Sequence, residues 1–291
     1  MSEQAQKLIE EFTRNDEIRD AGLTQPEEVE RLDDIVYGGN ARWQVMDLYR
    51  PKGCADRLPV IVSVHGGGWV YGDKERYQYY CMDLARRGVA VANFTYRLAP
   101  MFKFPAPLED LNLVMTWLKA HAEERLLDMG NLFAVGDSAG AHCLGLYSDI
   151  LCNPAYAARF PFTVPEGLCL RAVALNCGVY RMAPLRDDEP SLLRDYLPLG
   201  GTPEEIRMLD ICGNMGDRFP PAFIMTAPQD FLKPQAAVLA AQLAEKNTEH
   251  VLRFYVDDAC SLAHVFHLNI RSPWAGMCND DECAFFRAHI V

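Results

Sequence analysis

The pentapeptide Gly136-Asp137-Ser138-Ala139-Gly140 is the part of the sequence best suited to chemistry. It follows an apolar run and precedes apolar residues at helical spacing, so we expect a strand, a sharp turn and a helix. At such a turn the serine takes a strained conformation, and the flanking glycines let strand and helix approach closely. Ser138 is therefore the predicted nucleophile, provided that a neighbouring base takes its proton.

Two residues later in the chain could activate this serine. Asp230 follows the apolar run 221–227, and His264 lies in the loop after the last predicted strand. His264 would accept the proton of Ser138, while Asp230 would fix the tautomer of the imidazole and stabilise its charged form. Asp257 and Asp258 are alternative acids, but their position close to His264 is more typical of a turn.

The other histidines and Asp137 have other expected roles. His142 lies one helical turn beyond the serine and is expected to pack near the sheet, while His267 is a weaker competitor for the role of base. His65 is expected to brace the glycine loop that it opens, and Asp137 to support a neighbouring loop. The remaining histidines are expected at the surface: His121, His250 and His289.

Three consecutive glycines follow the β-branched run 58–64, in the segment His65-Gly66-Gly67-Gly68-Trp69. Glycines at the end of a strand expose backbone N–H groups that no side chain shields, as a site for a developing oxyanion requires. A flexible loop is the alternative, but it seldom follows a buried strand. We therefore expect this loop to lie beside the nucleophile.

The elements that position these residues alternate between strands and helices. The run 58–64 is typical of a central strand that is covered on both faces, and the alternation implies crossovers and a mostly parallel sheet. The class is therefore α/β, with helices on both sides of the sheet. Strands are predicted at 42–49, 58–64, 89–94, 131–136, 170–179, 221–227 and 251–256, and helices at 74–87, 107–123, 139–146, 235–245 and 281–290.

Two segments stand outside this alternation within a single predicted domain, 1–291. Residues 1–35 are predicted to form one or two charged cap helices, with a break between Gly22 and Pro26. They could cover the site or simply pack on the body. The polar segment 181–218 is too long for a simple connection and is predicted to be an inserted cap with short helices. Within it, Arg186, Asp187, Asp188 and Glu189 could meet a polar alcohol such as a sugar, although a solvated face is favoured.

Composition excludes several classes of partner. The formal net charge is −12 and the chain has no Lys/Arg-rich run, which argues against binding to nucleic acid or to an anionic membrane. Residues 1–10 carry charges where a signal peptide needs an apolar core, and no apolar run reaches the length of a membrane span. We therefore expect a cytoplasmic protein. The residue pattern leaves open whether the chain forms a homo-oligomer.

The ten cysteines are scattered, several of them within apolar segments, as expected for reduced thiols in a reducing compartment. Cys278 and Cys283 lack a second ligand pair at zinc-like spacing, so no metal site is predicted. The predicted chemistry also needs no cofactor.

Four motifs in this order resemble the hormone-sensitive-lipase-like branch of the α/β-hydrolase carboxylesterases. They are HGGGW at 65–69, YRLAP at 96–100, GDSAG at 136–140, and Asp230 with His264 near the C-terminus. The resemblance implies an α/β-hydrolase fold, short acyl esters as substrates, a triad of Ser138, Asp230 and His264, and an oxyanion hole formed by the backbone of Gly67, Gly68 and Ala139. Members of the family often have glycine directly after the histidine, whereas this chain has Val265.

Other functions are compatible with part of this pattern. An amidase or arylformamidase could use the same triad, and a ligand-binding protein could retain the scaffold, although such proteins usually lack a triad member. A peptidase would normally need a gating domain, for which no residues are left. Trp69, Tyr180 and Met182, together with both cap segments, are the predicted determinants of substrate choice.

Overall fold

The computed structural model describes residues 1–186, 191–259 and 261–291. The expectation that Asp187, Asp188 and Glu189 contact a polar alcohol lies outside these residues.

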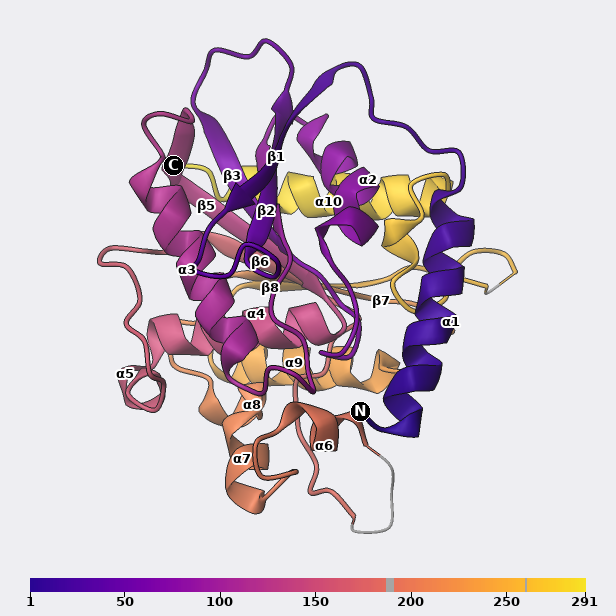
Figure 1. Cartoon of the computed structure of the whole chain (residues 1–291), viewed down its shortest axis with the longest axis vertical. Coiled ribbons are helices and arrows are strands. Elements are labelled where there is room, and N and C mark those ends of the chain that lie inside the picture. Colours follow the sequence, from indigo (N-terminus) through magenta and orange to yellow (C-terminus); the bar gives the residue numbers. More distant parts are fainter. Residues whose placement is uncertain (187–190, 260) are drawn as a thin grey trace.

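In the described part of the chain, eight strands form one sheet in the order β1-β2-β4-β3-β5-β6-β7-β8 (Figure 1). The first three strands in this order pair antiparallel, and β4 to β8 pair parallel, which confirms the predicted α/β class and mostly parallel sheet. The strands are β1 (Val29–Val36), β2 (Val45–Pro51), β3 (Leu58–Val64), β4 (Ala90–Phe94), β5 (Leu127–Asp137), β6 (Ala172–Asn176), β7 (Ala222–Thr226) and β8 (His250–Phe254).

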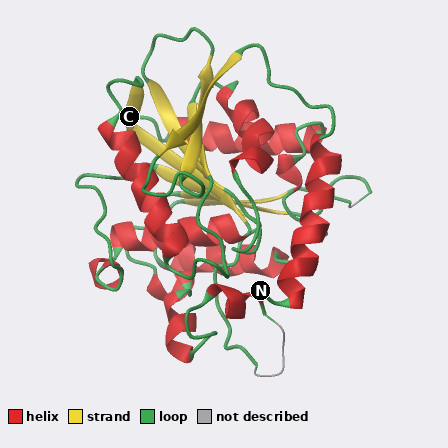
Figure 2. Ribbon diagram, in the orientation of Figure 1, coloured by secondary structure: helices red, strands yellow, loops and turns green. Residues whose placement is uncertain are grey.

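Helices cover both faces of this sheet (Figure 2). Alternate residues of β3 face opposite sides, so Val60 and Val62 pack in one apolar cluster and Ile61 in the other. The first cluster includes residues of α3, α4 and α9, and the second includes residues of α2 and α10. These helices are α2 (Lys74–Ala85), α3 (Ala106–Ala120), α4 (Ala139–Cys152), α9 (Lys233–Glu245) and α10 (Pro273–Ala288).

The N-terminal prediction was wrong in its second half. Residues 3–20 form one helix, α1 (Glu3–Asp20), but the segment predicted as further cap helix contains the edge strand β1, which pairs antiparallel with β2. The charges that suggested a solvated helix are also suited to an edge strand, where they discourage pairing with another chain. In Figure 1, α1 runs along one flank of the molecule.

The inserted segment forms short helices, as predicted: α6 (Leu192–Tyr196), α7 (Pro203–Met208) and α8 (Ile211–Asn214). Two further short elements are α5 (Pro154–Ala157) and the 3₁₀ helix η1 (Phe266–Leu268). The start of α10 was predicted too late, at residue 281. Pro273 begins this helix because a proline at the first helical position lacks only an N–H that would have no helical partner.

Candidate active site

The predicted turn holds Ser138 in a strained conformation between β5 and α4. Its backbone has φ 52° and ψ −119°, which is rare for a residue with a side chain. A Cβ atom at Gly140 would lie 2.0 Å from the carbonyl oxygen of Val64, and one at Gly136 would lie 2.7 Å from the backbone of Gly140. Both glycines are therefore needed for the close approach of strand and helix, as the motif predicted.

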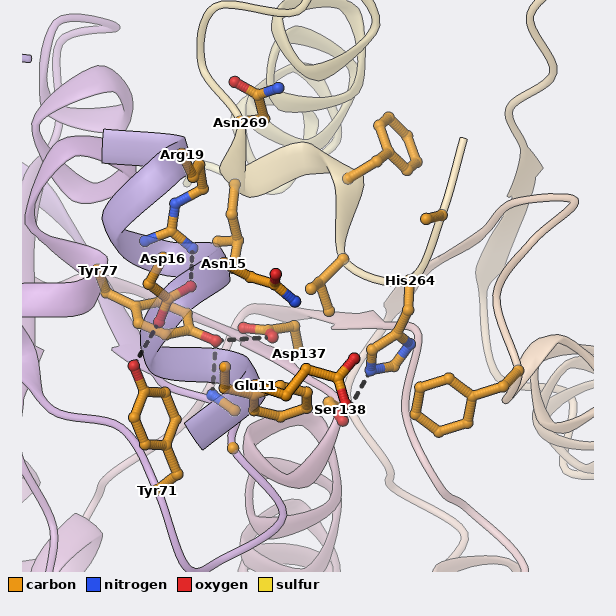
Figure 3. A pocket seen from close by; sticks show the side chains of 18 of the residues that line it. Glu11, Asn15, Asp16, Arg19, Tyr71, Tyr77, Asp137, Ser138, His264 and Asn269 are labelled. Atoms are coloured by element: carbon orange, nitrogen blue, oxygen red, sulfur yellow. Dashed lines mark hydrogen bonds and ion pairs between the residues drawn. The ribbon is translucent and has the colours of Figure 1, made fainter. Parts of the chain in front are cut away.

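The structure brings the three predicted triad residues into one hydrogen-bonded chain. Figure 3 shows its first link, between Ser138 and His264. His264 Nε2 lies 2.9 Å from the Oγ of Ser138, and His264 Nδ1 lies 2.7 Å from Oδ1 of Asp230. Because the carboxylate of Asp230 can only accept a hydrogen bond, the neutral imidazole carries its proton on Nδ1. Nε2 is then free to accept the hydrogen bond, and later the proton, of the serine hydroxyl. This arrangement can support nucleophilic attack by the hydroxyl.

Two loops that are distant in sequence meet to form this chain. The Gln229 N–H donates to the carbonyl of Leu262, so the loops after β7 and β8 lie side by side. Asp230 accepts hydrogen bonds from the Thr226 hydroxyl at 2.7 Å and from the Leu232 N–H at 2.9 Å. Burial favours the neutral acid, but the hydrogen bonds from His264 and these two donors outweigh it and lower the pKa of Asp230.

Val265, which replaces the glycine common in the resembling family, has a left-handed backbone with φ 53° and ψ 32°. This conformation accounts for the usual glycine, because a β-branched residue rarely adopts it. The chain keeps the backbone geometry of the loop and adds an apolar side chain that lines the cavity.

The glycine loop after β3 lies beside the serine with free donors. Gly67 has φ 111°, and a Cβ there would lie 2.1 Å from the carbonyl oxygen of Tyr71, so only glycine fits. No described residue accepts a hydrogen bond from the N–H of Gly67 or Gly68. Ala139 is the first residue of α4, so its N–H has no acceptor within the helix. These are the groups predicted for the oxyanion hole.

A buried side-chain relay fixes the start of this loop. The Gly66 N–H donates to the hydroxyl of Tyr77 at 2.8 Å, and that hydroxyl donates to Oδ2 of Asp137 at 2.8 Å. Asp137 therefore supports the neighbouring loop, as predicted. Burial raises its pKa to about 7, although the hydrogen bond from Tyr77 acts in the opposite direction.

The other two histidines considered near the serine are buried and structural. His65 donates from Nδ1 to the carbonyl of Gly66 and stacks on Tyr96, so it braces the loop as expected. His142 donates from Nε2 to the carbonyl of Leu209 at 3.0 Å. Burial lowers the pKa of both imidazoles to about 4, which keeps them neutral near pH 7.

His267, the predicted weaker competitor for the base, is completely buried, and neither nitrogen of its imidazole has a hydrogen-bond partner among the described residues. Asp257 accepts hydrogen bonds from the backbone and side chain of Ser261, as expected for a turn residue.

Cys177 offers a ligand atom within 4.8 Å of ligand atoms on Asp230 and His264. Because Asp230 and His264 are hydrogen-bonded to each other, we assign no metal ion to these three residues.

A cavity of about 510 Å³ opens above the serine (Figure 3). One wall comes from α1, with Glu11, Phe12, Asn15, Asp16 and Arg19. The predicted packing of the N-terminal helix on the body therefore places it over the site. The opposite wall includes Phe231, Ala263, Val265, Phe266, Leu268 and Asn269.

Sequence reasoning missed these cavity residues for different reasons. Phe231 directly follows the predicted acid and could have been found from that position. Glu11 and its neighbours on α1 carried no such signal, because their place in the cavity wall depends on how the helix docks.

The predicted substrate residues lie elsewhere, which corrects that expectation. Tyr180 is fully buried and donates its hydroxyl proton to the carbonyl of Leu175, because the chain turns inward after β6. Met182 lines a separate cavity in the insert. Trp69 stacks on Tyr196 with ring centroids 4.9 Å apart, is buried, and does not line the cavity.

The known proteins most useful for comparison are esterases. A family model described as BD-FAE matches residues 46–149. An esterase of Gibberella moniliformis is 40% identical over 97 residues, 33% of this chain and 30% of that protein. An ethyl acetate hydrolase of Pseudomonas putida is 28% identical over 68% of this chain and 64% of its own length. The crystal structure of esterase B from Lactobacillus rhamnosis superposes with a TM-score of 0.87 at 24% identity, over 98% of this chain and 94% of that chain.

The sequence matches are partial. The aligned segments span only 28%, 30% and 35% of the length of three curated relatives. The structural match extends over nearly the whole chain and shows the fold. Among the described residues, no helix combines the length and apolar character needed to span a membrane.

Proposed function

Because the chain has the α/β-hydrolase fold and the motifs of the hormone-sensitive-lipase-like carboxylesterases, we propose that it is a serine carboxylesterase that acts on short acyl esters. The observation that carries this proposal is the chain Ser138–His264–Asp230 beside unpaired backbone N–H groups. A hydroxyl, a base and oxyanion donors in one cavity are the parts that acyl transfer requires.

In the first half of the proposed reaction, Ser138 Oγ attacks the ester carbonyl carbon while His264 Nε2 accepts the hydroxyl proton. The carbonyl oxygen becomes an oxyanion that accepts hydrogen bonds from the N–H groups of Gly67, Gly68 and Ala139. Asp230 stabilises the imidazolium. The intermediate collapses as the bond to the alcohol oxygen breaks, and His264 returns its proton to that oxygen, which leaves an acyl-serine.

Water completes the cycle. His264 accepts a proton from the water as its oxygen attacks the acyl carbon, and the same N–H groups hold the second oxyanion. Collapse then breaks the bond to Ser138 Oγ, which takes the proton from the imidazolium and releases the carboxylic acid. All groups that move protons belong to this chain, so the reaction as drawn uses no cofactor.

The preference for short acyl groups rests on the surroundings of Gly68. A Cβ atom there would lie 2.8 Å from Cδ1 of Leu192 and 3.5 Å from Cδ1 of Leu8. These leucines come from α6 and α1, so both covering segments close over the proposed oxyanion hole. An acyl chain that extends past this glycine meets them after a few carbons.

The expected substrate partner is a small-molecule ester. A cytoplasmic location is part of the same proposal, because the nine described cysteines are free, as is typical of a reducing compartment.

The test is hydrolysis of p-nitrophenyl esters from acetate to decanoate at neutral pH by wild type, Ser138→Ala and Ser148→Ala. Ser148 lies on the same helix and donates only to the carbonyl of Leu144, so it is the matched control. We expect fast cleavage of the short esters by wild type and the control, and a loss of roughly a thousandfold or more in Ser138→Ala.

Covalent labelling gives a second readout of the same proposal. A p-nitrophenyl alkylphosphonate should add one phosphonyl group to Ser138, detected by mass spectrometry of the peptide, and none to the Ser138→Ala protein. Equal, slow ester cleavage by all three proteins would contradict the proposal. Preferential cleavage of formanilides over matched esters would favour the amidase alternative.

A further inference from the structure

Glu11 is the one cavity-lining carboxylate of α1 that the rest of the described chain leaves unpaired. It is exposed and lines the cavity with Ser138 and His264, and its carboxylate forms no hydrogen bond or ion pair with any described residue. Figure 3 shows its side chain extending from α1 toward the serine and the imidazole. A charged side chain in such a position is available to a bound molecule.

The positive charge in the same wall is already compensated. The Arg19 guanidinium donates to Asp16 at 2.8 Å and to both carboxylate oxygens of Asp20 at 2.7 Å. Asp16 also accepts the hydroxyl proton of Tyr71 at 2.8 Å. The charges of α1 near the cavity therefore sum to a negative value, with Glu11 as the unpaired contribution.

Aromatic rings accompany this carboxylate. Phe12 and Tyr71 form an edge-to-face pair on the α1 side, with centroids 5.9 Å apart. On the opposite side, Phe231 is 69% exposed and its ring centroid lies 4.2 Å from that of His264. Carboxylate and aromatic faces around one space are the groups that attract an ammonium ion, through charge and through the ring quadrupole.

The position of the base decides which part of an ester meets these groups. The leaving alcohol oxygen must face His264 Nε2 in order to receive its proton, and Phe231, Ala263 and Val265 line the cavity beside that imidazole. The acyl side is bounded at Gly68 by Leu8 and Leu192. The alcohol portion therefore occupies the cavity that contains Glu11.

We infer that the enzyme selects esters whose alcohol carries an ammonium group, and that Glu11 is the specificity-determining residue. This inference rests on the proposed esterase function and adds the substrate class to it. Glu11 stabilises the cationic alcohol in the cavity, while the aromatic rings contact its methyl or methylene groups. Esters with an anionic alcohol portion are disfavoured by the same charge.

The experiment compares acetylcholine with its uncharged carbon isostere, 3,3-dimethylbutyl acetate, at low ionic strength. The two have the same shape, so the ratio of their kcat/KM values reports the charge alone. We expect the wild type to prefer acetylcholine about tenfold, mainly through KM, and the preference to fall in high salt. Glu11→Gln should reduce the ratio to near one.

Glu10→Gln is the matched control, because it removes the same charge from the adjacent, exposed position of α1, which does not line the cavity. It should retain the wild-type ratio. A change of the same size in both variants would mean that the overall charge of the helix acts, and it would overturn the assignment to Glu11.

The outcomes separate this inference from the proposed function. Cleavage of both esters at equal kcat/KM by wild type would overturn the ammonium preference and leave the esterase intact. If neither ester nor any p-nitrophenyl ester were cleaved, the esterase proposal would fail. Calorimetric titration of choline into wild type and Glu11→Gln would then decide the ammonium site, since equal or undetectable binding in both proteins would reject it.

Discussion

The turn that carries Ser138 and the segments that cover it are built in different ways. At the turn, backbone approaches backbone: a Cβ at Gly140 would lie 2.0 Å from the Val64 oxygen, and Gly66, Tyr77 and Asp137 are joined by buried hydrogen bonds. Such contacts permit few substitutions. The groups proposed for chemistry are therefore fixed by the packing of the sheet.

The covering segments are attached mainly through side chains, by apolar packing and by hydrogen bonds. The backbone N–H and hydroxyl of Ser2 donate to Asp195 of α6, which ties the start of α1 to the insert. At the other end of α1, Arg271 donates to the carbonyls of Arg19 and Ala21. Helices held in this way can change their exposed residues without disturbing the fold, so we expect substrate choice to be encoded there.

Within the turn region, the largest expected change in activity comes from Tyr77→Phe. The substitution removes the hydroxyl that accepts from Gly66 N–H and donates to Asp137, so the glycine loop loses its anchor. We expect kcat on p-nitrophenyl acetate to fall by about tenfold to a hundredfold, with KM within about twofold of wild type.

Tyr80→Phe is the matched control for this change. Tyr80 lies on the same helix, is equally buried, and donates its hydroxyl proton to Glu282 rather than to the loop. Both variants should lose similar thermal stability, because each leaves a buried partner unpaired. If kcat fell equally in both, the relay at Gly66 would have no specific role.

The same contrast explains how much could be predicted from the sequence. The turn and the glycine loop follow from local chemistry, and β3 has the bounds predicted from its β-branched run. The order of acid and histidine was instead taken from the α/β-hydrolase pattern. The relay through Tyr77 was not predicted, although Asp137 was assigned a supporting role. The tyrosine lies 60 residues from its carboxylate partner, and the helical pattern shows only that it is buried.

The covering segments were harder to predict. Charged residues are compatible with an exposed helix and with an edge strand, so the pattern of residues 1–35 does not distinguish β1 from a helix. Trp69, Tyr180 and Met182 were the predicted determinants of substrate choice. The fold instead buries the first two, and it places Glu11 and Phe12 at the cavity through the docking of α1.

A smaller effect is expected from Leu192→Ala, on the covering side. The leucine Cδ1 lies close to Gly68, so its removal lengthens the space beside the proposed oxyanion hole. We expect the ratio of kcat/KM for hexanoate over acetate to rise roughly fivefold. The space that the leucine leaves lets the longer acyl chain bury about one more methylene group. The kcat on acetate should stay near wild type.

The control is Leu199→Ala, which removes an exposed leucine from the same insert. It should leave the ratio of hexanoate to acetate unchanged. An unaltered ratio in Leu192→Ala as well would show that the acyl chain leaves the serine in another direction, and it would weaken the contrast between a fixed turn and adjustable cover.

The smallest expected effect is a change in thermal stability on substitution of Asp149. This residue lies on α4, which runs from the turn toward the insert. Its side chain is fully buried and neither carboxylate oxygen has a hydrogen-bond partner among the described residues. Burial, followed by the nearby charge of Asp210, raises its pKa well above the usual range. The folded protein therefore retains a proton that the unfolded chain releases above about pH 4.

The sign of the pH dependence follows from this proton. Because the folded state binds more protons, its stability relative to the unfolded chain decreases as the pH rises above the unfolded pKa. Asp149→Asn removes this contribution, so its Tm should exceed that of wild type by about 3 °C more at pH 8 than at pH 5. Asp258→Asn, at an exposed position, should show the same difference at both pH values. Equal Tm differences for Asp149→Asn at the two pH values would mean that this carboxyl ionises in the folded protein, and that water or a cation reaches the junction between α4 and the insert.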